Sequence, residues 1–219
     1  SPGHGVDFWS LGLQITGIAS LTGALNLIVT VINMRAPGMT LWRMPIFTWM
    51  VLVVQFLLVF AIPVITVALF LLSFQRNFGA TFFDVNQGAD PLLWQHLFWI
   101  FGHPEVYIII LPAIALLAMI VPTFAGRPIV GYSWIVLAAV GTGFLSFGLW
   151  VHHMFATGLP QISLAFFSAA SGAVAIPTGV QIFVFIATML AGRVIFSTPM
   201  LFAMGGLAIF VMGGLTGVM

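Results

Sequence analysis

The sequence predicts an all-α, polytopic transmembrane helix bundle, and three observations predict it. First, 62% of the 219 residues are hydrophobic and only 4% are charged, whereas about 25% of the residues in soluble domains are charged. Second, the mean hydropathy of the chain is +1.22. Third, the apolar residues form six runs, and each reaches the roughly 20 residues that a helix needs to cross a bilayer. We find no internal repeat and no soluble domain, so we expect residues 1–219 to form one transmembrane domain.

The first three spans are bounded by charged or turn-forming residues. A run at about 8–34 ends before Arg35, and a run at about 44–74 ends before a polar stretch. A run at about 91–121 follows that stretch and ends before Gly126-Arg-Pro. Helices end at such glycine, proline and charged positions, so we expect three helices here.

The last three spans are separated by glycine and proline. They cover about 129–152, 161–191 and 198–219, with Thr157-Gly-Leu-Pro160 and then Gly192-Arg193 between them. Length and hydropathy predict a membrane span in each run. Prolines inside the runs predict kinks or locally open backbone: Pro63, Pro112 and Pro177.

The few charges predict the orientation of the helices. Four arginines fall in connections that share one side of the membrane: Arg35, Arg43, Arg127 and Arg193. The positive-inside rule makes that side cytoplasmic and the amino terminus outer, or periplasmic. No basic segment precedes the first run, so no signal peptide is expected. A net charge of +1 argues against a nucleic-acid surface, and the lack of cysteine excludes disulfides and thiolate metal sites.

The third run contains polar groups that are costly to place in lipid and therefore indicate function. His103 and Tyr107 are four residues apart, so they share one helix face. Glu105 is the one formally charged side chain well inside a predicted span. It could be a buried, protonated carboxyl bonded to a neighbouring helix, and such a neutral carboxyl is also what a proton relay needs.

Two adjacent histidines, His152 and His153, end the fourth run. With the predicted orientation, they and His103 all lie in the outer half of the membrane. On an ideal helix the pair would point about 100° apart, so both can bind one ion only if the helix end is distorted. They could instead be polar residues at a helix terminus. Imidazole-only ligation suits copper, zinc or iron, and a set with an open position suits redox copper. His96 and His4 are expected to be polar surface residues.

Long motifs along the chain resemble subunit I of the haem–copper terminal oxidases. They occur in the family's order, which corresponds to the fourth through ninth of its twelve core helices, so the chain resembles a central segment of subunit I. The motifs begin at these residues: Asn33-Met-Arg-Ala-Pro, Trp94-Gln-His-Leu-Phe-Trp-Ile-Phe-Gly-His-Pro-Glu-Val-Tyr, Trp150-Val-His-His-Met, Ala175-Ile-Pro-Thr-Gly and Gly213-Gly-Leu-Thr-Gly.

The resemblance implies a copper site, copper B. His103, His152 and His153 match its three ligands. Tyr107 matches the tyrosine that is bonded covalently to the ligand histidine one turn away and donates an electron and a proton during O–O cleavage. Val106 matches the residue beside the oxygen path, and we expect it and Trp99 to contact the cofactors.

The resemblance also implies proton pathways. Glu105 matches the carboxyl that ends the D pathway, and Ser20 and Asn26 match polar members of that pathway nearer the cytoplasm. The K pathway is named for a lysine, but this chain has Gln181 there, three residues after Thr178. Glutamine binds water but carries no titratable proton. The second pathway must therefore be built differently, with Thr178 and ordered water or with a residue outside the chain.

The implied activity is four-electron reduction of O₂ to water, coupled to proton translocation. The family uses copper together with a high-spin haem of the a3 or o type and a low-spin haem, whose axial ligands match no motif in this chain. The chain alone is therefore not expected to be active. Implied partners are the remaining helices of subunit I, subunits II and III, and the lipid of a bacterial plasma membrane, with a mitochondrial inner membrane less favoured.

Three other functions remain open. Cytochrome c is favoured as the electron donor by Trp94-Gln-His-Leu-Phe-Trp, and quinol is the competing donor. A nitric oxide reductase is disfavoured, because those relatives lack the tyrosine at position 107. A membrane scaffold or transporter fragment with a structural metal is the alternative from a different class, and it predicts no haem.

Overall fold

The computed structural model describes residues 3–218, and this part of the chain is helical without a strand. The prediction of an all-α transmembrane bundle is therefore confirmed. Five helices are long and apolar enough to cross a membrane, counting α5 and α6 as one, and α4 is a shorter apolar helix. The α-helices are α1 (Gly5–Asn33), α2 (Ile46–Phe78), α3 (Leu92–Ala125), α4 (Tyr132–Leu145), α5 (Gln161–Ala173), α6 (Ala175–Leu190) and α7 (Thr198–Val218).

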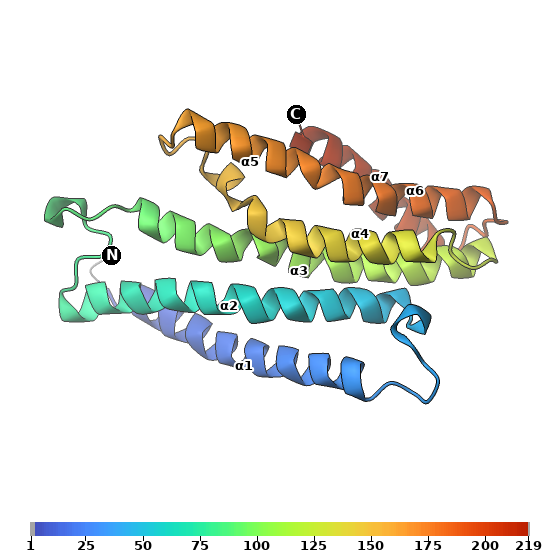
Figure 1. The fold of residues 1–219 in the computed structure, drawn as a ribbon, viewed down its shortest axis with the longest axis horizontal. Helices are drawn as coiled ribbons and strands as arrows, with labels where there is room; N and C mark the ends of the chain where they lie inside the picture. Colours follow the sequence, from blue (N-terminus) through green and yellow to red (C-terminus); the bar gives the residue numbers. More distant parts are fainter. Residues whose placement is uncertain (1–2, 219) are drawn as a thin grey trace.

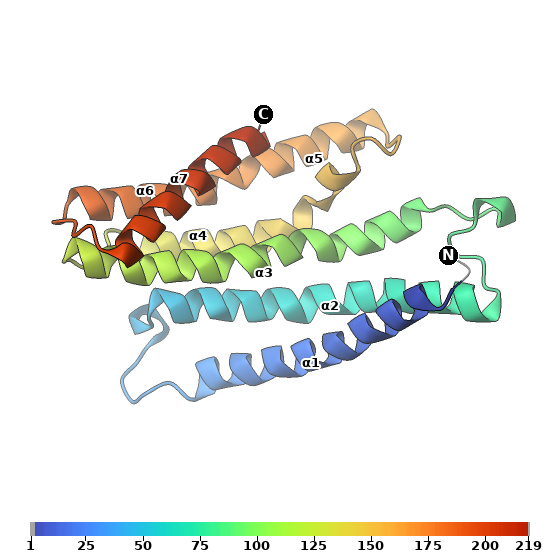
Figure 2. The same cartoon turned by 180° about the vertical axis from the view of Figure 1, so that it is seen from behind.

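The helices run roughly side by side, with α2 and α3 in the middle of the molecule (Figure 1). Helix α1 packs on α2, while α4, α6 and α7 lie on the side of α3 (Figures 1 and 2). The core forms where α2, α3, α4 and α6 meet, around Met50, Ile114, Ile135 and Phe185, which are almost fully buried. Gly143 lets α4 approach α2 closely, because a Cβ there would lie 2.6 Å from Val53 Cγ1.

The end of the bundle that carries Arg35, Arg43, Arg127 and Arg193, here called the arginine-rich end, is held together by backbone hydrogen bonds. Arg193 N donates to Ala125 O at 2.9 Å, which ties the segment after α6 to the end of α3. Val130 N donates to Thr188 Oγ1 at 3.0 Å, which ties the start of α4 to the end of α6. The ends of α3, α4 and α6 are therefore level.

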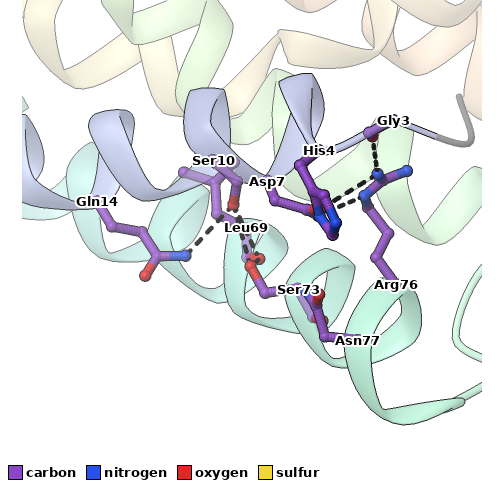
Figure 3. Close-up of polar contacts among 9 residues, drawn as sticks. All are labelled: Gly3, His4, Asp7, Ser10, Gln14, Leu69, Ser73, Arg76 and Asn77. Carbon is purple, nitrogen blue, oxygen red and sulfur yellow. Dashed lines mark hydrogen bonds and ion pairs between the residues drawn. The ribbon is translucent and has the colours of Figure 1, made fainter.

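At the opposite end, polar side chains join α1 to α2 (Figure 3). Arg76 Nε donates to Asp7 Oδ1 at 2.6 Å, and His4 Nδ1 lies 3.0 Å from Asp7 Oδ2. Deeper in the pair, Ser10 Oγ lies 3.1 Å from Ser73 Oγ. We call these contacts the α1–α2 polar seam. They fix the rotation of α1, which otherwise buries only small residues.

The fourth predicted span, 129–152, does not form a single α-helix. The α-helix ends at Leu145 and is followed by two 3₁₀ segments, η3 (Ser146–Gly148) and η4 (Trp150–Met154). Ser146 Oγ donates to Gly143 O at 2.6 Å, and Leu149 has φ −138°, outside the helical range. The side-chain bond and the non-helical residue turn the chain before it reaches the histidine pair.

The fifth predicted span, 161–191, is also interrupted, between α5 and α6. Pro177 explains the break, because it has no N–H for the carbonyl four residues earlier and its ring clashes with that carbonyl. That carbonyl belongs to Ala173, where α5 ends. The kink expected at Pro177 is thus present, whereas α2 and α3 continue through Pro63 and Pro112.

Candidate metal centre

Three histidines from two separate elements meet at one point. His103 lies in α3, and His152 and His153 lie in η4. His103 Nδ1 is 3.1 Å from His153 Nε2, and His152 Nε2 is also 3.1 Å from His153 Nε2. One ring nitrogen from each of the three histidines lies within 4.8 Å of the other two. The helix distortion that the adjacent pair requires is supplied by the break before η4.

The chemistry of this donor set fits a transition-metal ion. Three neutral imidazoles offer three nitrogen lone pairs, and no carboxylate or thiolate joins them within the described residues. His103 is 4% exposed, and His152 is half-buried. Imidazole sets of this kind suit copper, zinc and iron.

The hydrogen bonds around His152 determine which of its nitrogens can bind a metal. Ser171 Oγ donates to Phe167 O at 2.6 Å and lies 2.8 Å from His152 Nδ1. Because the hydroxyl proton of Ser171 points to Phe167, the hydroxyl accepts from His152 Nδ1–H. The lone pair of His152 is then on Nε2, the atom that faces His153. Metal-bound histidines usually have their second nitrogen held in this way.

Aromatic side chains pack around the other two histidines. The Trp99 and His153 rings are stacked, with centroids 4.0 Å apart and an interplanar angle of 5°. Tyr107 lies edge-on to His103 with ring centroids 4.8 Å apart. His103 Nε2 is buried and has no hydrogen-bond partner among the described residues. The His103 ring therefore contacts Tyr107 and has one nitrogen that no described residue satisfies.

Two other predicted site residues lie beside this cluster on α3. Glu105 is half-buried, and its carboxyl makes no hydrogen bond with another described residue. Val106 is 43% exposed, so its side chain faces away from the packed core of this segment.

The structure does not bring Ser20 and Asn26 to Glu105. Both lie on α1, which packs on α2 rather than on α3. Ser20 Oγ donates to Thr16 O at 2.9 Å within its own helix, and Asn26 is exposed. Any link from these residues to Glu105 needs water or side chains outside the described contacts.

Thr178 and Gln181 do lie near the histidines, on the wall of an open cavity of about 1130 Å³ that also has Tyr107 and His152 in its lining. We call it the Tyr107 cavity. Thr178 Oγ1 donates to Val174 O at 2.9 Å, and Gln181 is 2% exposed with its Nε2 unpartnered.

Sequence reasoning missed three residues at this site. Ser171 gave no signal, because serine is common in membrane helices and its role depends on the turn that brings η4 back to α5. His96 was expected at the surface, yet it is half-buried and accepts a hydrogen bond from Trp150 Nε1 at 3.2 Å. Thr142 is buried in α4 and lines the Tyr107 cavity. Its neighbours in the sequence are mostly apolar, so no sequence pattern indicated a role for Thr142.

The fold and the histidine site together are those of a membrane-embedded metalloprotein, and comparison with known proteins identifies its family. Residues 1–219 match the family described as cytochrome c and quinol oxidase polypeptide I. The chain belongs to this family, subunit I of the haem–copper oxidases.

Several bacterial relatives are similar over the whole chain. Cytochrome c oxidase subunit 1 of Bacillus subtilis is 51% identical, over 100% of this chain and 35% of the relative. Quinol oxidase subunit 1 of Bacillus spizizenii is 50% identical, over 100% of this chain and 34% of the relative. A probable cytochrome c oxidase subunit 1-beta of Nocardia farcinica is 48% identical, over 100% of this chain and 37% of the relative. The chain thus spans about a third of the length of these relatives.

Proposed function

We propose that this chain forms the copper-binding part of subunit I in a terminal respiratory oxidase that reduces O₂ to water and translocates protons. The observation that carries the proposal is the convergence of three imidazole nitrogens, His103 Nδ1, His152 Nε2 and His153 Nε2. Those three atoms would hold copper B. When bound, the copper supplies an electron and an open coordination position beside a haem iron.

The protein's contribution around the copper is to orient ligands and hold protons. Ser171 fixes the tautomer of His152, and Trp99 holds the ring plane of His153 by stacking. The Tyr107 ring contacts the His103 ring, whose Nε2 has no partner among the described residues, and this supports the role of a tyrosine bonded to that ring and able to give up a proton and an electron. Val106 would flank the path of O₂.

Glu105 would deliver protons to the site. It follows the copper ligand His103 by two residues, in a stretch of α3 that is otherwise apolar. The Glu105 carboxyl makes no hydrogen bond within the described chain. This supports the proposal that the carboxyl can turn between a proton source and the metal site. Ser20 and Asn26 would belong to the polar route that leads to it from the cytoplasm, completed by helices of subunit I outside this chain.

A second route would pass Gln181 and Thr178 on the wall of the Tyr107 cavity. Neither side chain titrates near neutral pH, so protons on this route must travel through water that the two side chains bind. The substitution of glutamine for the family's lysine therefore changes how protons are carried, while Tyr107 remains at the end of the route.

The assembled oxidase would contain the remaining helices of subunit I, which carry the ligands of a high-spin a3- or o-type haem and of a low-spin haem, together with subunits II and III. It would lie in a bacterial plasma membrane, with the arginine-rich end in the cytoplasm. We propose cytochrome c as donor, on the Trp94-Gln-His-Leu-Phe-Trp motif. Quinol is the second candidate, since one relative of 50% identity is a quinol oxidase.

The copper assignment is tested by metal analysis of the assembled complex. His103→Ala and His152→Ala should each abolish copper binding at this site and oxygen reduction, because two imidazoles cannot hold the ion in a trigonal set. His4→Ala is the matched control, since His4 is exposed just before the first residue of α1 and lies against Asp7. This variant should retain copper. Unchanged copper in both site variants would disprove the assignment. Zinc in place of copper, with no haem spectrum in the wild type, would favour a scaffold with a structural metal.

A further inference from the structure

Two buried polar side chains on the neighbouring helices α4 and α6 each have an atom without a hydrogen-bond partner among the described residues. Thr142 in α4 is 3% exposed and Gln181 in α6 is 2% exposed. Thr142 Oγ1 and Gln181 Nε2 are both buried without a partner among the described residues. Burying a hydroxyl or an amide without a hydrogen bond costs free energy, so groups in this state need a partner.

Threonines in membrane helices normally satisfy their hydroxyl within the helix, and this chain follows that habit elsewhere. Thr178 Oγ1 donates to Val174 O at 2.9 Å, and Thr188 Oγ1 donates to Val184 O at 2.7 Å. Thr142 Oγ1 makes no such bond. Its hydroxyl is therefore available to a partner outside its own helix.

Thr142 and Gln181 lie at the same depth in the bundle. At the arginine-rich end, the start of α4 and the end of α6 are level, because Val130 N donates to Thr188 Oγ1. Helix rise puts Thr142 about 15 Å from the start of α4, and Gln181 about 14 Å from the end of α6. Ala139 and Phe185, about one turn nearer the arginine-rich end on the same helices, belong to one packed core cluster.

Both residues line the Tyr107 cavity, which has a volume of about 1130 Å³. Tyr107 lies farther from the arginine-rich end, about 27 Å of helix rise from the end of α3. Thr178 falls between these depths, about 18 Å from the end of α6. From the arginine-rich end inward, the polar groups thus follow the order Thr142 with Gln181, Thr178, and then Tyr107.

We propose that Thr142 and Gln181 bind ordered water between α4 and α6, and that this water begins the route by which protons reach Tyr107 in a chain without the usual lysine. The Thr142 hydroxyl can donate and accept at once, and the Gln181 amide offers donors and an acceptor. A water held by both has the two to four polar partners that a buried water requires. This inference rests on the proposed function for its proton route, but the water site itself does not.

A cryo-electron microscopy map of the assembled oxidase, at a resolution that shows ordered water, tests the site directly. We expect a water within hydrogen-bond distance of both Thr142 Oγ1 and Gln181 Nε2, and its loss in Thr142→Val, which removes the hydroxyl and keeps the shape. A dry site, or a side chain from another helix bonded to these two atoms, would overturn the proposal.

The proton route is tested by the rate at which the metal pair accepts electrons under anaerobic conditions. Thr142→Val should slow this reduction about tenfold, the effect of losing one hydrogen bond, while the reaction of the reduced enzyme with O₂ is unchanged. Thr142→Ser should restore the rate. The matched control is Thr66→Val in α2, whose hydroxyl bonds only to Ile62 O in its own helix, and it should reduce at the wild-type rate. Equal slowing in both valine variants would contradict a specific role for Thr142.

Gln181→Lys gives a second test. If water bound by Thr142 and Gln181 already carries the protons, a lysine at this position should not raise the turnover of the oxidase tenfold. A rise of an order of magnitude would show that the native route is limited by the missing lysine, and would overturn the proposal. Copper content and haem spectra distinguish failure of the water route from failure of the proposed function. A wild-type protein without copper and without haem spectra would refute the oxidase. A wild-type protein with normal spectra but no water at the site would refute only the water route.

Discussion

At the scale of single residues, the site depends on a few polar side chains whose partners are defined. His152 is fixed by Ser171, His153 is stacked on Trp99, and the His103 ring lies edge-on to Tyr107. Glu105 differs from these residues, because no hydrogen bond holds its carboxyl among the described residues. A carboxyl that is half-buried and unpaired can change its rotamer at low cost, which is the property a proton carrier needs.

We expect Glu105→Gln to reduce oxygen turnover by about a hundredfold or more, because an amide of the same shape cannot transfer a proton. Glu105→Asp should retain part of the activity if water spans the gap left by one methylene. The measurements are oxygen consumption and proton uptake by the assembled complex, with copper content as the control. A Gln variant that consumes oxygen and takes up protons at wild-type rates would show that protons reach the site without Glu105.

At the scale of secondary-structure elements, the 3₁₀ segment η4 matters most, because it carries two of the three histidines. Contacts tie it to its neighbours on both sides: Trp150 Nε1 donates to His96 on α3, and the Trp150 ring packs on Phe167 of α5, with centroids 5.0 Å apart. His96 lies two turns before His103 on α3. One bond therefore links the element that carries His152 and His153 to the helix that carries the third histidine.

We expect His96→Phe to weaken copper binding about tenfold, the lower range for loss of an outer contact at a metal site. His96→Gln, which keeps an acceptor for the Trp150 indole, should restore most of the affinity. Copper retention against a chelator, measured on the assembled complex, distinguishes the two variants. If the Phe variant keeps its copper and the Gln variant loses it, ring packing rather than the hydrogen bond holds η4.

The fold was largely predictable from the sequence, because the hydrocarbon core demands long apolar helices and little else satisfies the backbone there. The break in the fourth span was not, since residues 129–152 are predominantly apolar and hydropathy cannot distinguish an α-helix from a 3₁₀ turn. The histidine cluster was predictable as a possibility: His152 and His153 required a distorted helix end, and that condition was evident. The role of Ser171 and the pairing of His96 with Trp150 depend on tertiary contacts between elements distant in the sequence, so no local pattern could indicate them.

At the scale of the whole molecule, the chain corresponds to only part of its relatives' length. It spans about a third of its relatives, with 35% of the Bacillus subtilis subunit covered. Large apolar side chains such as Phe144 and Leu190 are each 82% exposed. The two histidines outside the cluster are already engaged, His96 by Trp150 and His4 by Asp7.

We therefore expect residues 1–219, expressed alone in membranes, to bind no haem and to consume no oxygen. The same residues within the full-length subunit, co-expressed with its partners, should do both. Optical spectra of the solubilised membranes and an oxygen electrode provide the measurements. A haem spectrum from the isolated chain would show that a histidine within it can serve as an axial ligand.

The α1–α2 polar seam has a consequence for how the protein enters the membrane. Asp7 and Ser10 of α1 have partners on α2, because Arg76 donates to Asp7 and the Ser73 hydroxyl lies against that of Ser10. Until α2 has been synthesised, Asp7 and Ser10 would lack these partners, at a cost that favours delayed insertion of α1. The two helices are thus suited to leave the translocon together as a hairpin, with the Asp7–Arg76 ion pair closing once both have been synthesised.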